Sequence, residues 1–97
     1  MSVVTEVKVK IPAMFQSSTG GVTTAEVSGA TVGECLTQLS NQFPALRKML
    51  FDEGDKLSGY LTVIINGQGL KDSLINVYNI PVKPGDEIYP LILIEGG

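Results

Sequence analysis

The sequence predicts an α+β domain in which a mixed sheet of four to five strands packs on one main helix. Three patterns predict this class: an N-terminal segment that alternates apolar and polar residues, a central apolar stripe at helical spacing, and a β-prone C-terminal half with two turn motifs. The 97 residues, 43% of them hydrophobic, suffice for one core and are too few for two. We therefore expect one domain over residues 1–97, with residues 95–97 as a flexible tail.

The N-terminal segment predicts a β-hairpin. Residues 3–11 alternate with the period of two that is typical of a strand with one dry and one wet face. Residues 16–21 are typical of a turn, and residues 22–28 favour extended structure. Gly20 and Gly21 lack the lysine and hydroxyl residue of a phosphate-binding loop, so we interpret them as a turn with positive φ angles.

The main helix is predicted to begin at a capping box. The Thr31 hydroxyl caps a backbone amide, and Glu34 reaches back to the Thr31 amide. Pro44 ends the helix, and a further helical turn follows over the edge of the core. The apolar positions of the helix and of that turn are Val32, Leu36, Leu39, Phe43, Leu46, Met49 and Leu50. Cys35 lies beside the stripe, and we interpret it as a small buried hydrophobe rather than a catalytic thiol.

The C-terminal half predicts three further strands. Residues 60–66 are strongly β-prone and partly apolar on both faces. Asn66-Gly67 is the dipeptide favoured by type I′ hairpin turns and leads to a short strand near Leu70. A second turn at residues 84–86, Pro-Gly-Asp, precedes the last strand, from Glu87 to about Ile94.

Composition excludes several classes of function. The formal charge of −3, from 7 basic and 10 acidic residues, argues against a nucleic-acid partner. No signal sequence or membrane-spanning stretch is evident, so we expect a cytoplasmic protein with no membrane partner. With no histidine and a single cysteine, the chain offers neither the commonest general base nor the ligands of an iron–sulfur cluster. We expect no enzyme activity, no catalytic residues, no metal site and no cofactor bound by this chain.

The C-terminus carries the most informative motif. Gly96-Gly97 follows the aliphatic run from Leu91 to Ile94 and the acidic Glu95. Without Cβ atoms, a diglycine can enter a channel too narrow for other residues and present its carboxylate there. Chance occurrence and a frayed glycine-rich end are the alternative explanations.

Joined to the predicted layout, this ending resembles the ubiquitin-like sulfur carriers of the ThiS/MoaD superfamily, most of all the CysO-type carriers. The resemblance covers essentially the whole chain, and it implies a ubiquitin-like β-grasp fold. It is carried by Ile11-Pro12, Thr19-Gly20-Gly21, Thr31-Val32-Gly33, the strand at residues 63–67, Pro84-Gly85-Asp86 and the terminal glycines. In two respects the tail departs from such carriers, because Pro90 lies further back and Glu95 directly precedes the glycines.

The resemblance implies a mechanism. A ubiquitin-activating-type adenylyltransferase would use ATP to convert the Gly97 carboxylate to an acyl-adenylate. A sulfur nucleophile would displace AMP and leave a thiocarboxylate, whose sulfur a downstream synthase would accept in cysteine, molybdopterin, thiamine or related biosynthesis. A metalloprotease that releases product or trims the tail is a further implied partner.

An apolar sheet surface is the expected docking site for these partners, with Tyr60, Ile64, Leu91, Ile92, Leu93 and Ile94 as candidates. Two other functions remain open from the residues alone. The chain could be a ubiquitin-like modifier conjugated through Gly97 to lysines, or an inert β-grasp interaction module.

Overall fold

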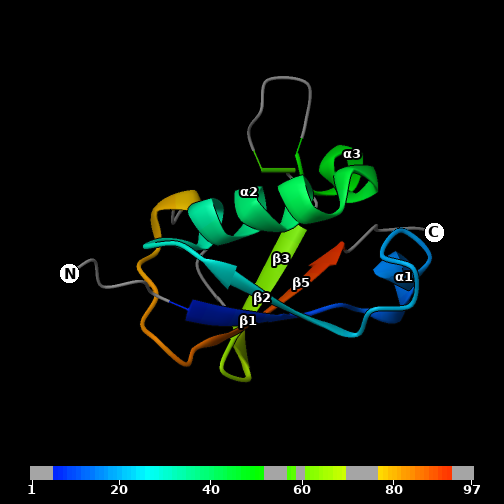
Figure 1. Ribbon diagram of the computed structural model, residues 1–97. Helices are drawn as coiled ribbons and strands as arrows, with labels where there is room; N and C mark the ends of the chain where they lie inside the picture. The colour runs from blue at the N-terminus through cyan, green and yellow to red at the C-terminus, as the bar shows by residue number, and fades with distance from the viewer. Residues whose placement is uncertain (1–5, 52–56, 59–60, 70–76, 93–97) are drawn as a thin grey trace.

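A five-stranded mixed sheet with one long helix across one face confirms the predicted α+β class. The computed structural model describes residues 6–51, 57–58, 61–69 and 77–92 (Figure 1). The elements in chain order are β1 (Glu6–Lys10), α1 (Ala13–Gln16), β2 (Thr24–Ser28), α2 (Val32–Gln42), η1 (Pro44–Leu46), α3 (Arg47–Leu50), β3 (Leu61–Ile65), β4 (Gln68–Gly69), η2 (Val77–Asn79) and β5 (Glu87–Ile92).

The sheet order is β2-β1-β5-β3-β4, so the last long strand lies in the centre. β5 pairs in parallel with β1 and antiparallel with β3, while β1–β2 and β3–β4 are antiparallel hairpins. The parallel register pairs Lys8 with Glu87 and Val9 with Ile88, and it stops there. Pro90 follows two residues later and has no N–H to donate to a neighbouring strand. Beyond Ile88, β5 is therefore paired through β3, as far as the pair Leu61–Ile92.

The predicted N-terminal hairpin is confirmed, but its connection contains a short helix that the sequence did not predict. Pro12 precedes the four-residue α1, and Phe15 inserts its ring into the core with 3% exposure. A helix of one turn is too short to produce a visible apolar period, which is why the pattern missed it. Gly20 and Gly21 follow with φ angles of +67° and +89°, as the turn interpretation requires.

The α2 helix begins at the predicted capping box. The Glu34 amide donates to the Thr31 hydroxyl at 3.2 Å. The Glu34 carboxylate accepts from the Ala30 amide at 3.2 Å, one residue before the predicted donor, Thr31. The capping box is still reciprocal, because the Thr31 side chain bonds an amide in the first turn of the helix and the Glu34 side chain bonds an amide just before it.

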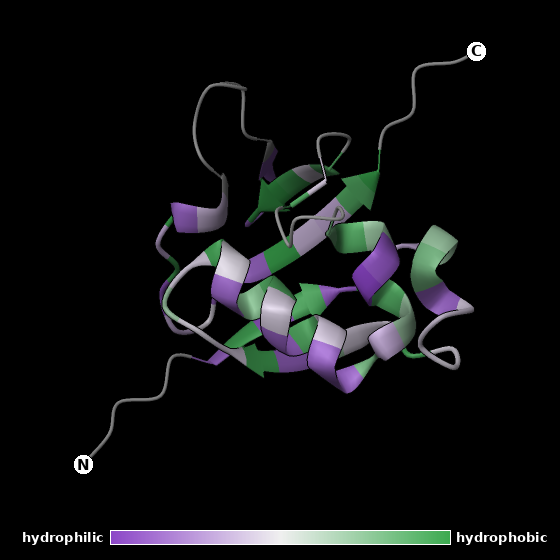
Figure 2. Cartoon of the chain, turned by 90° about the horizontal axis from the view of Figure 1, so that it is seen from above, coloured by the Kyte–Doolittle hydropathy of each residue, from purple (hydrophilic) through white to green (hydrophobic). Residues whose placement is uncertain are grey.

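One hydrophobic core fills the space between α2 and the sheet, and the elements contribute to it with their expected periods. Figure 2 looks down on α2 and shows hydrophilic residues on its outer surface, with hydrophobic strands beneath. The predicted turn after the helix also forms, with Leu46 and Leu50 fully buried, whereas Met49 points outward and is 37% exposed. The core comprises Val7, Val9, Ile11, Phe15, Ala25, Val27, Val32, Cys35, Leu36, Leu39, Leu46, Leu50, Phe51, Val63, Val82 and Ile88.

Asn66 and Asp86 form a polar hub that joins the β3–β4 turn to the start of β5. Asn66 and Gly67 have φ angles of +53° and +80°, which confirms the predicted type I′ turn. The Asn66 amide donates to Asp86 Oδ1 at 3.0 Å, and its carbonyl accepts from the Glu87 N–H at 2.9 Å. Asp86 Oδ2 accepts from the Lys83 N–H at 2.8 Å.

These hydrogen bonds lower the pKa of Asp86 below its ordinary value of 3.8, the Asn66 bond contributing most. Since the pKa of the folded state is the lower one, ionised Asp86 stabilises the fold above pH 3.8. That contribution is lost as the pH falls through the folded value.

A second close contact fixes η2 against α2. A Cβ atom added to Gly33 would overlap the ring of Tyr78, so the helix surface must be bare at this position. Tyr78 is 37% exposed, and its ring covers the glycine.

Asn66→Asp should destabilise the protein by about 1–3 kcal/mol near neutral pH, because a carboxylate replaces the donor beside Asp86. The loss should shrink between about pH 7 and about pH 5, where the paired carboxyls take up a proton. Chemical denaturation at several pH values measures both effects. Asn66→Gly keeps the positive φ and removes both side-chain bonds without adding a charge, so its loss should stay flat over this range. Equal pH dependence in the two variants would contradict the proposed repulsion.

Gly33→Ala should reduce the free energy of unfolding by about 1–3 kcal/mol, because the added methyl group displaces the Tyr78 ring. In a Tyr78→Ala background the same change should be neutral or stabilise by up to about 1 kcal/mol, since alanine favours helix over glycine. Thermal and chemical denaturation of the four proteins form a double-mutant cycle. A loss of the same size in both backgrounds would show that the ring is not the obstacle.

Candidate functional site

The candidate site combines the end of β5 with the sheet face that α2 leaves uncovered. Along β5, Ile88 and Pro90 face the core, so Glu87, Tyr89 and Leu91 face the opposite side. We call this opposite side the outer face. Gly97, the residue predicted to react, and the tail residues Gly96 and Glu95 lie outside the described residues, as do Leu93 and Ile94.

An apolar patch lies on the outer face of β3 and β5. The antiparallel register sets Ile64 directly opposite Tyr89 and Thr62 directly opposite Leu91. Paired residues of adjacent strands point to the same face and touch. The apolar patch is therefore Thr62, Ile64, Tyr89 and Leu91, all of them half-buried.

The predicted docking residues are thus separated by the pleat of the sheet. Ile64 and Leu91 lie together in the apolar patch. Ile92 lies on the inner face, where it packs half-buried against the core. Tyr60 lies outside the described residues. Tyr89 was not among the predicted residues, although its spacing of two from Leu91 in a single strand was a sufficient signal.

Beside the apolar patch, the outer face is hollowed. An open depression of about 520 Å³ is lined by Lys10, Ile64, Asn66, Gly67, Glu87 and Tyr89. Ile64 and Tyr89 supply the apolar part of its lining. The polar part includes an ion pair between Lys10 Nζ and Glu87 Oε2 at 3.8 Å. Because these side chains are 53% and 45% exposed, the pair adds little stability and both charges stay accessible. A partner's side chain can enter here with an apolar group beside a polar one.

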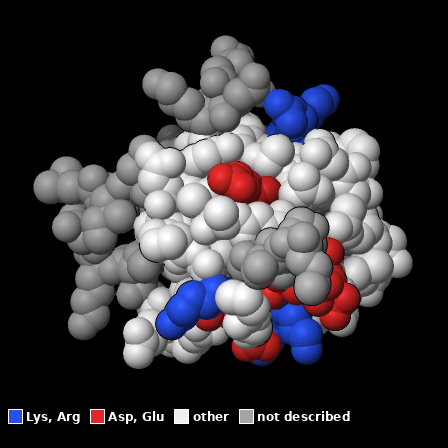
Figure 3. All heavy atoms as spheres, turned by 60° about the vertical axis from the view of Figure 1, so that its left-hand side comes forward, with Lys and Arg blue, Asp and Glu red and all other residues white. Residues whose placement is uncertain are grey.

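The charges of the outer face are mixed. Glu6, Lys8, Lys10 and Glu26 are the exposed charged residues of β1 and β2. Figure 3, which views the side of the molecule that lies on the left in Figure 1, likewise shows basic and acidic side chains interspersed. On β1 and β2 the exposed charges are therefore balanced, two acidic and two basic.

Cys35 is fully buried in α2, which confirms its interpretation as a core residue. Burial, together with the nearby carboxylates of Glu34 and Asp86, raises the pKa of its thiol to about 11. The thiol is therefore protonated at neutral pH and is not poised as a nucleophile.

The described part of the chain contains neither a cluster of potential metal ligands nor a helix that could span a membrane. Among residues 6–51, 57–58, 61–69 and 77–92, no group of three potential metal-ligating side chains comes together. The helices in those ranges include none that is long and apolar enough to cross a membrane. The chemical feature that the described residues do provide is a surface suited to binding, the apolar patch with its hollow, beside β5.

Neither a scan of protein-family models nor a search of curated proteins finds a match to this sequence. Solved structures do match. Small archaeal modifier protein 1 from Methanosarcina acetivorans is 30% identical, with a TM-score of 0.81, over 99% of this chain and 100% of that chain. A chain of the BexX/CysO complex from Amycolatopsis orientalis is 28% identical, with a TM-score of 0.78, over 94% of this chain and 99% of that chain.

A putative molybdopterin converting factor subunit 1 from Pyrococcus furiosus is 20% identical, with a TM-score of 0.68, over 93% of this chain and 99% of that chain. At this lower identity the likeness shows the fold alone, which is the predicted ubiquitin-like β-grasp. The match to the Methanosarcina protein spans both chains and extends to their sequences. This chain therefore belongs to the ubiquitin-like sulfur-carrier superfamily of ThiS and MoaD.

Proposed function

We propose that the chain is a sulfur carrier whose Gly97 carboxylate is activated by a partner enzyme and converted to a thiocarboxylate. The carrying observation is the match to a small modifier protein over the full length of both chains, in a sequence with the Gly96-Gly97 motif beyond its last strand. A further support is the BexX/CysO complex, in which a chain of this shape occurs together with a second protein.

The chemistry explains why a partner is needed. A carboxylate is a poor electrophile, since its charge repels nucleophiles and oxide is not expelled. An ATP-dependent adenylyltransferase would join the Gly97 carboxylate to AMP and release pyrophosphate. A sulfur nucleophile would then attack the carbonyl carbon and expel AMP, and the thiocarboxylate would deliver sulfur to a synthase. In this scheme the chain is not an enzyme and binds no cofactor, and ATP belongs to the partner.

The position of β5 limits where the partner can bind. Residues 93–97 follow the last described residue of β5, and five extended residues span at most about 18 Å. The partner's active site must therefore lie within about 18 Å of Ile92. The apolar patch and the adjacent hollow meet this limit, because Leu91 belongs to the patch and directly precedes Ile92 in β5. We propose that the activating enzyme docks there.

A second candidate function uses the same activated carboxylate. The name of the Methanosarcina protein is that of a modifier, which favours conjugation of Gly97 to lysine amines of other proteins. The first step would be unchanged, and only the nucleophile would differ. Recovery of Gly97 in isopeptide linkage from the native host would establish this function. An inert interaction module would instead be unaffected by removal of Gly96 and Gly97.

Gly97→Ala should leave the fold unchanged and slow thiocarboxylate formation by at least about tenfold, since a methyl group overfills a channel shaped for glycine. The assay is intact-mass analysis after incubation with ATP, a sulfur donor and the activating enzyme. Glu95→Ala is the matched control, because it changes the tail without obstructing the last two residues. Equal rates for the Gly97→Ala protein and the parent would contradict the channel model.

Ile64→Glu should weaken binding to the activating enzyme by at least about tenfold, because a charge replaces a central apolar contact. Calorimetry with the purified enzyme measures the dissociation constant. Thr24→Glu is the matched control, since it adds the same charge to the outer face on the distant strand β2. Both proteins should unfold at similar denaturant concentrations. If Ile64→Glu unfolds the protein instead, Ile64 is a core residue rather than a docking residue.

A further inference from the structure

β2 is an edge strand whose outward backbone groups can be assigned from the register. The Ile11 N–H donates to the Thr23 carbonyl at 2.8 Å, so this pair is a hydrogen-bonded one. Antiparallel pairs alternate between bonded and non-bonded types. Lys8–Glu26 is therefore a non-bonded pair, and the N–H and C=O groups of Glu26 point away from β1 toward the open side of the sheet. The same holds for Thr24 and Ser28.

Such a row of outward groups is a template for another strand. The chain's own β2 is a suitable partner, because two copies can pair antiparallel around a two-fold axis. With the axis at Glu26, each Glu26 would exchange both backbone bonds with its counterpart, and Thr24 would pair with Ser28 of the other copy. Five residues per copy match the length of an average strand.

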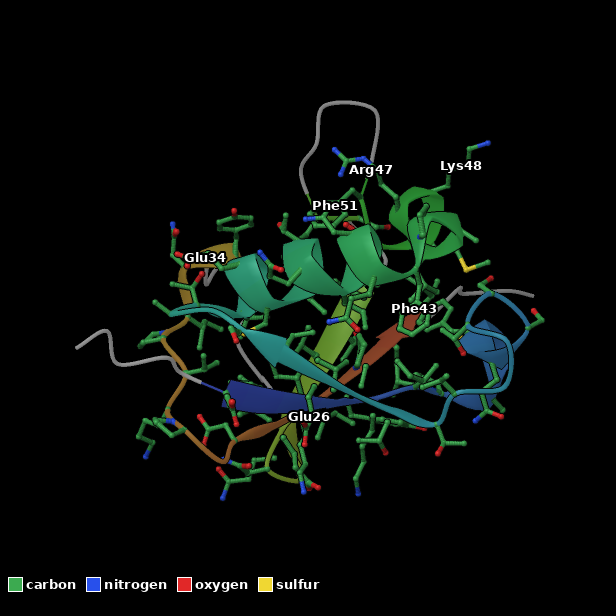
Figure 4. The ribbon with its side chains drawn as sticks, viewed as in Figure 1. Glu26, Glu34, Phe43, Arg47, Lys48 and Phe51 are labelled. Carbon is green, nitrogen blue, oxygen red and sulfur yellow. The ribbon has the colours of Figure 1, made fainter. Side chains whose placement is uncertain are left out.

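Two features of the structure oppose this pairing at its centre. The Gln42 side chain, from the last turn of α2, donates Nε2–H to the Glu26 carbonyl at 2.9 Å. It thereby occupies the acceptor that the second copy would need. The Glu26 side chain is exposed on the side of the sheet away from α2 (Figure 4). Two-fold pairing would set the two carboxylates directly opposite each other, and like charges so placed destabilise a sheet.

We propose that β2 is a latent self-association edge that Gln42 and Glu26 together keep closed to a second copy of this chain. Gln42 acts by covering a backbone acceptor, and Glu26 acts by charge repulsion. The two contributions are independent, so each can be removed alone. The proposal does not rest on the sulfur-carrier function, because it concerns the edge of the sheet farthest from β3 and from the apolar patch.

The test is sedimentation equilibrium of the full chain over a wide range of concentration. Gln42→Ala/Glu26→Thr should dimerise at least about tenfold more tightly than wild type, and each single variant should show a smaller gain. Gln38→Ala/Glu6→Thr is the matched control, since it changes an exposed glutamine of α2 and an exposed glutamate of β1. The control should behave like wild type. Both Gln42 and Glu26 are exposed, so their replacement should preserve the fold, which circular dichroism verifies.

Amide hydrogen exchange identifies the surface used. In the Gln42→Ala/Glu26→Thr dimer, the amides at positions 24, 26 and 28 should become protected, whereas in wild type they should exchange freely. The proposal is overturned if the folded double variant has the same average mass as wild type at every concentration. It is also overturned if the variant associates without protecting these amides, or if wild type already protects them. Should the double variant fail to fold, the Gln42→Ala protein decides by the same two measurements.

Discussion

The antiparallel pairing of β3 with β5 decides which side chains face the core and which form the candidate site. Its register places Ile65, Ile88, Val63 and Pro90 toward the core and, by the same pleat, Ile64 and Tyr89 toward the outer face. A shift by one residue would exchange the two sets, burying Tyr89 and exposing Ile88. The hub of Asn66 and Asp86 pins one end of this ladder, since it bonds the β3–β4 turn to the first residues of β5. The core and the apolar patch thus follow from one register.

β5 lies in the centre of the sheet, but Pro90 prevents it from pairing on both sides along its whole length. A central strand normally pairs on both sides, yet the parallel register with β1 ends at Ile88. The imide nitrogen of Pro90 cannot continue it, so the second half of β5 is paired through β3. Because it pairs on one side only, the C-terminal part of β5 is held to the sheet by fewer backbone hydrogen bonds than its start. That arrangement would suit the proposed function, in which the continuation of the strand enters a partner enzyme.

Local signals predicted most of the fold, and contacts between distant residues account for what they missed. The Thr31 cap, the Asn66-Gly67 turn and the period of β1 each depend on residues within a few positions of one another. The Asn66–Asp86 bond and the Gln42–Glu26 bond join residues 20 and 16 positions apart, and neither pair has a recognisable motif. In the candidate site, Ile64 and Leu91 share the outer face, whereas Ile92 lies on the inner face, because neighbouring residues of a strand point to opposite sides.

Sulfur on Gly97 can be detected by intact mass spectrometry of the protein isolated from its native cells. A sulfur carrier should include a fraction of molecules heavier by the difference between one sulfur and one oxygen atom, with fragmentation placing the exchange at Gly97. Incubation with ATP, sulfide and the activating enzyme should increase that fraction. A C-terminal carboxylate alone, unchanged by that incubation, would contradict the sulfur-carrier function and leave the modifier or the interaction module in its place.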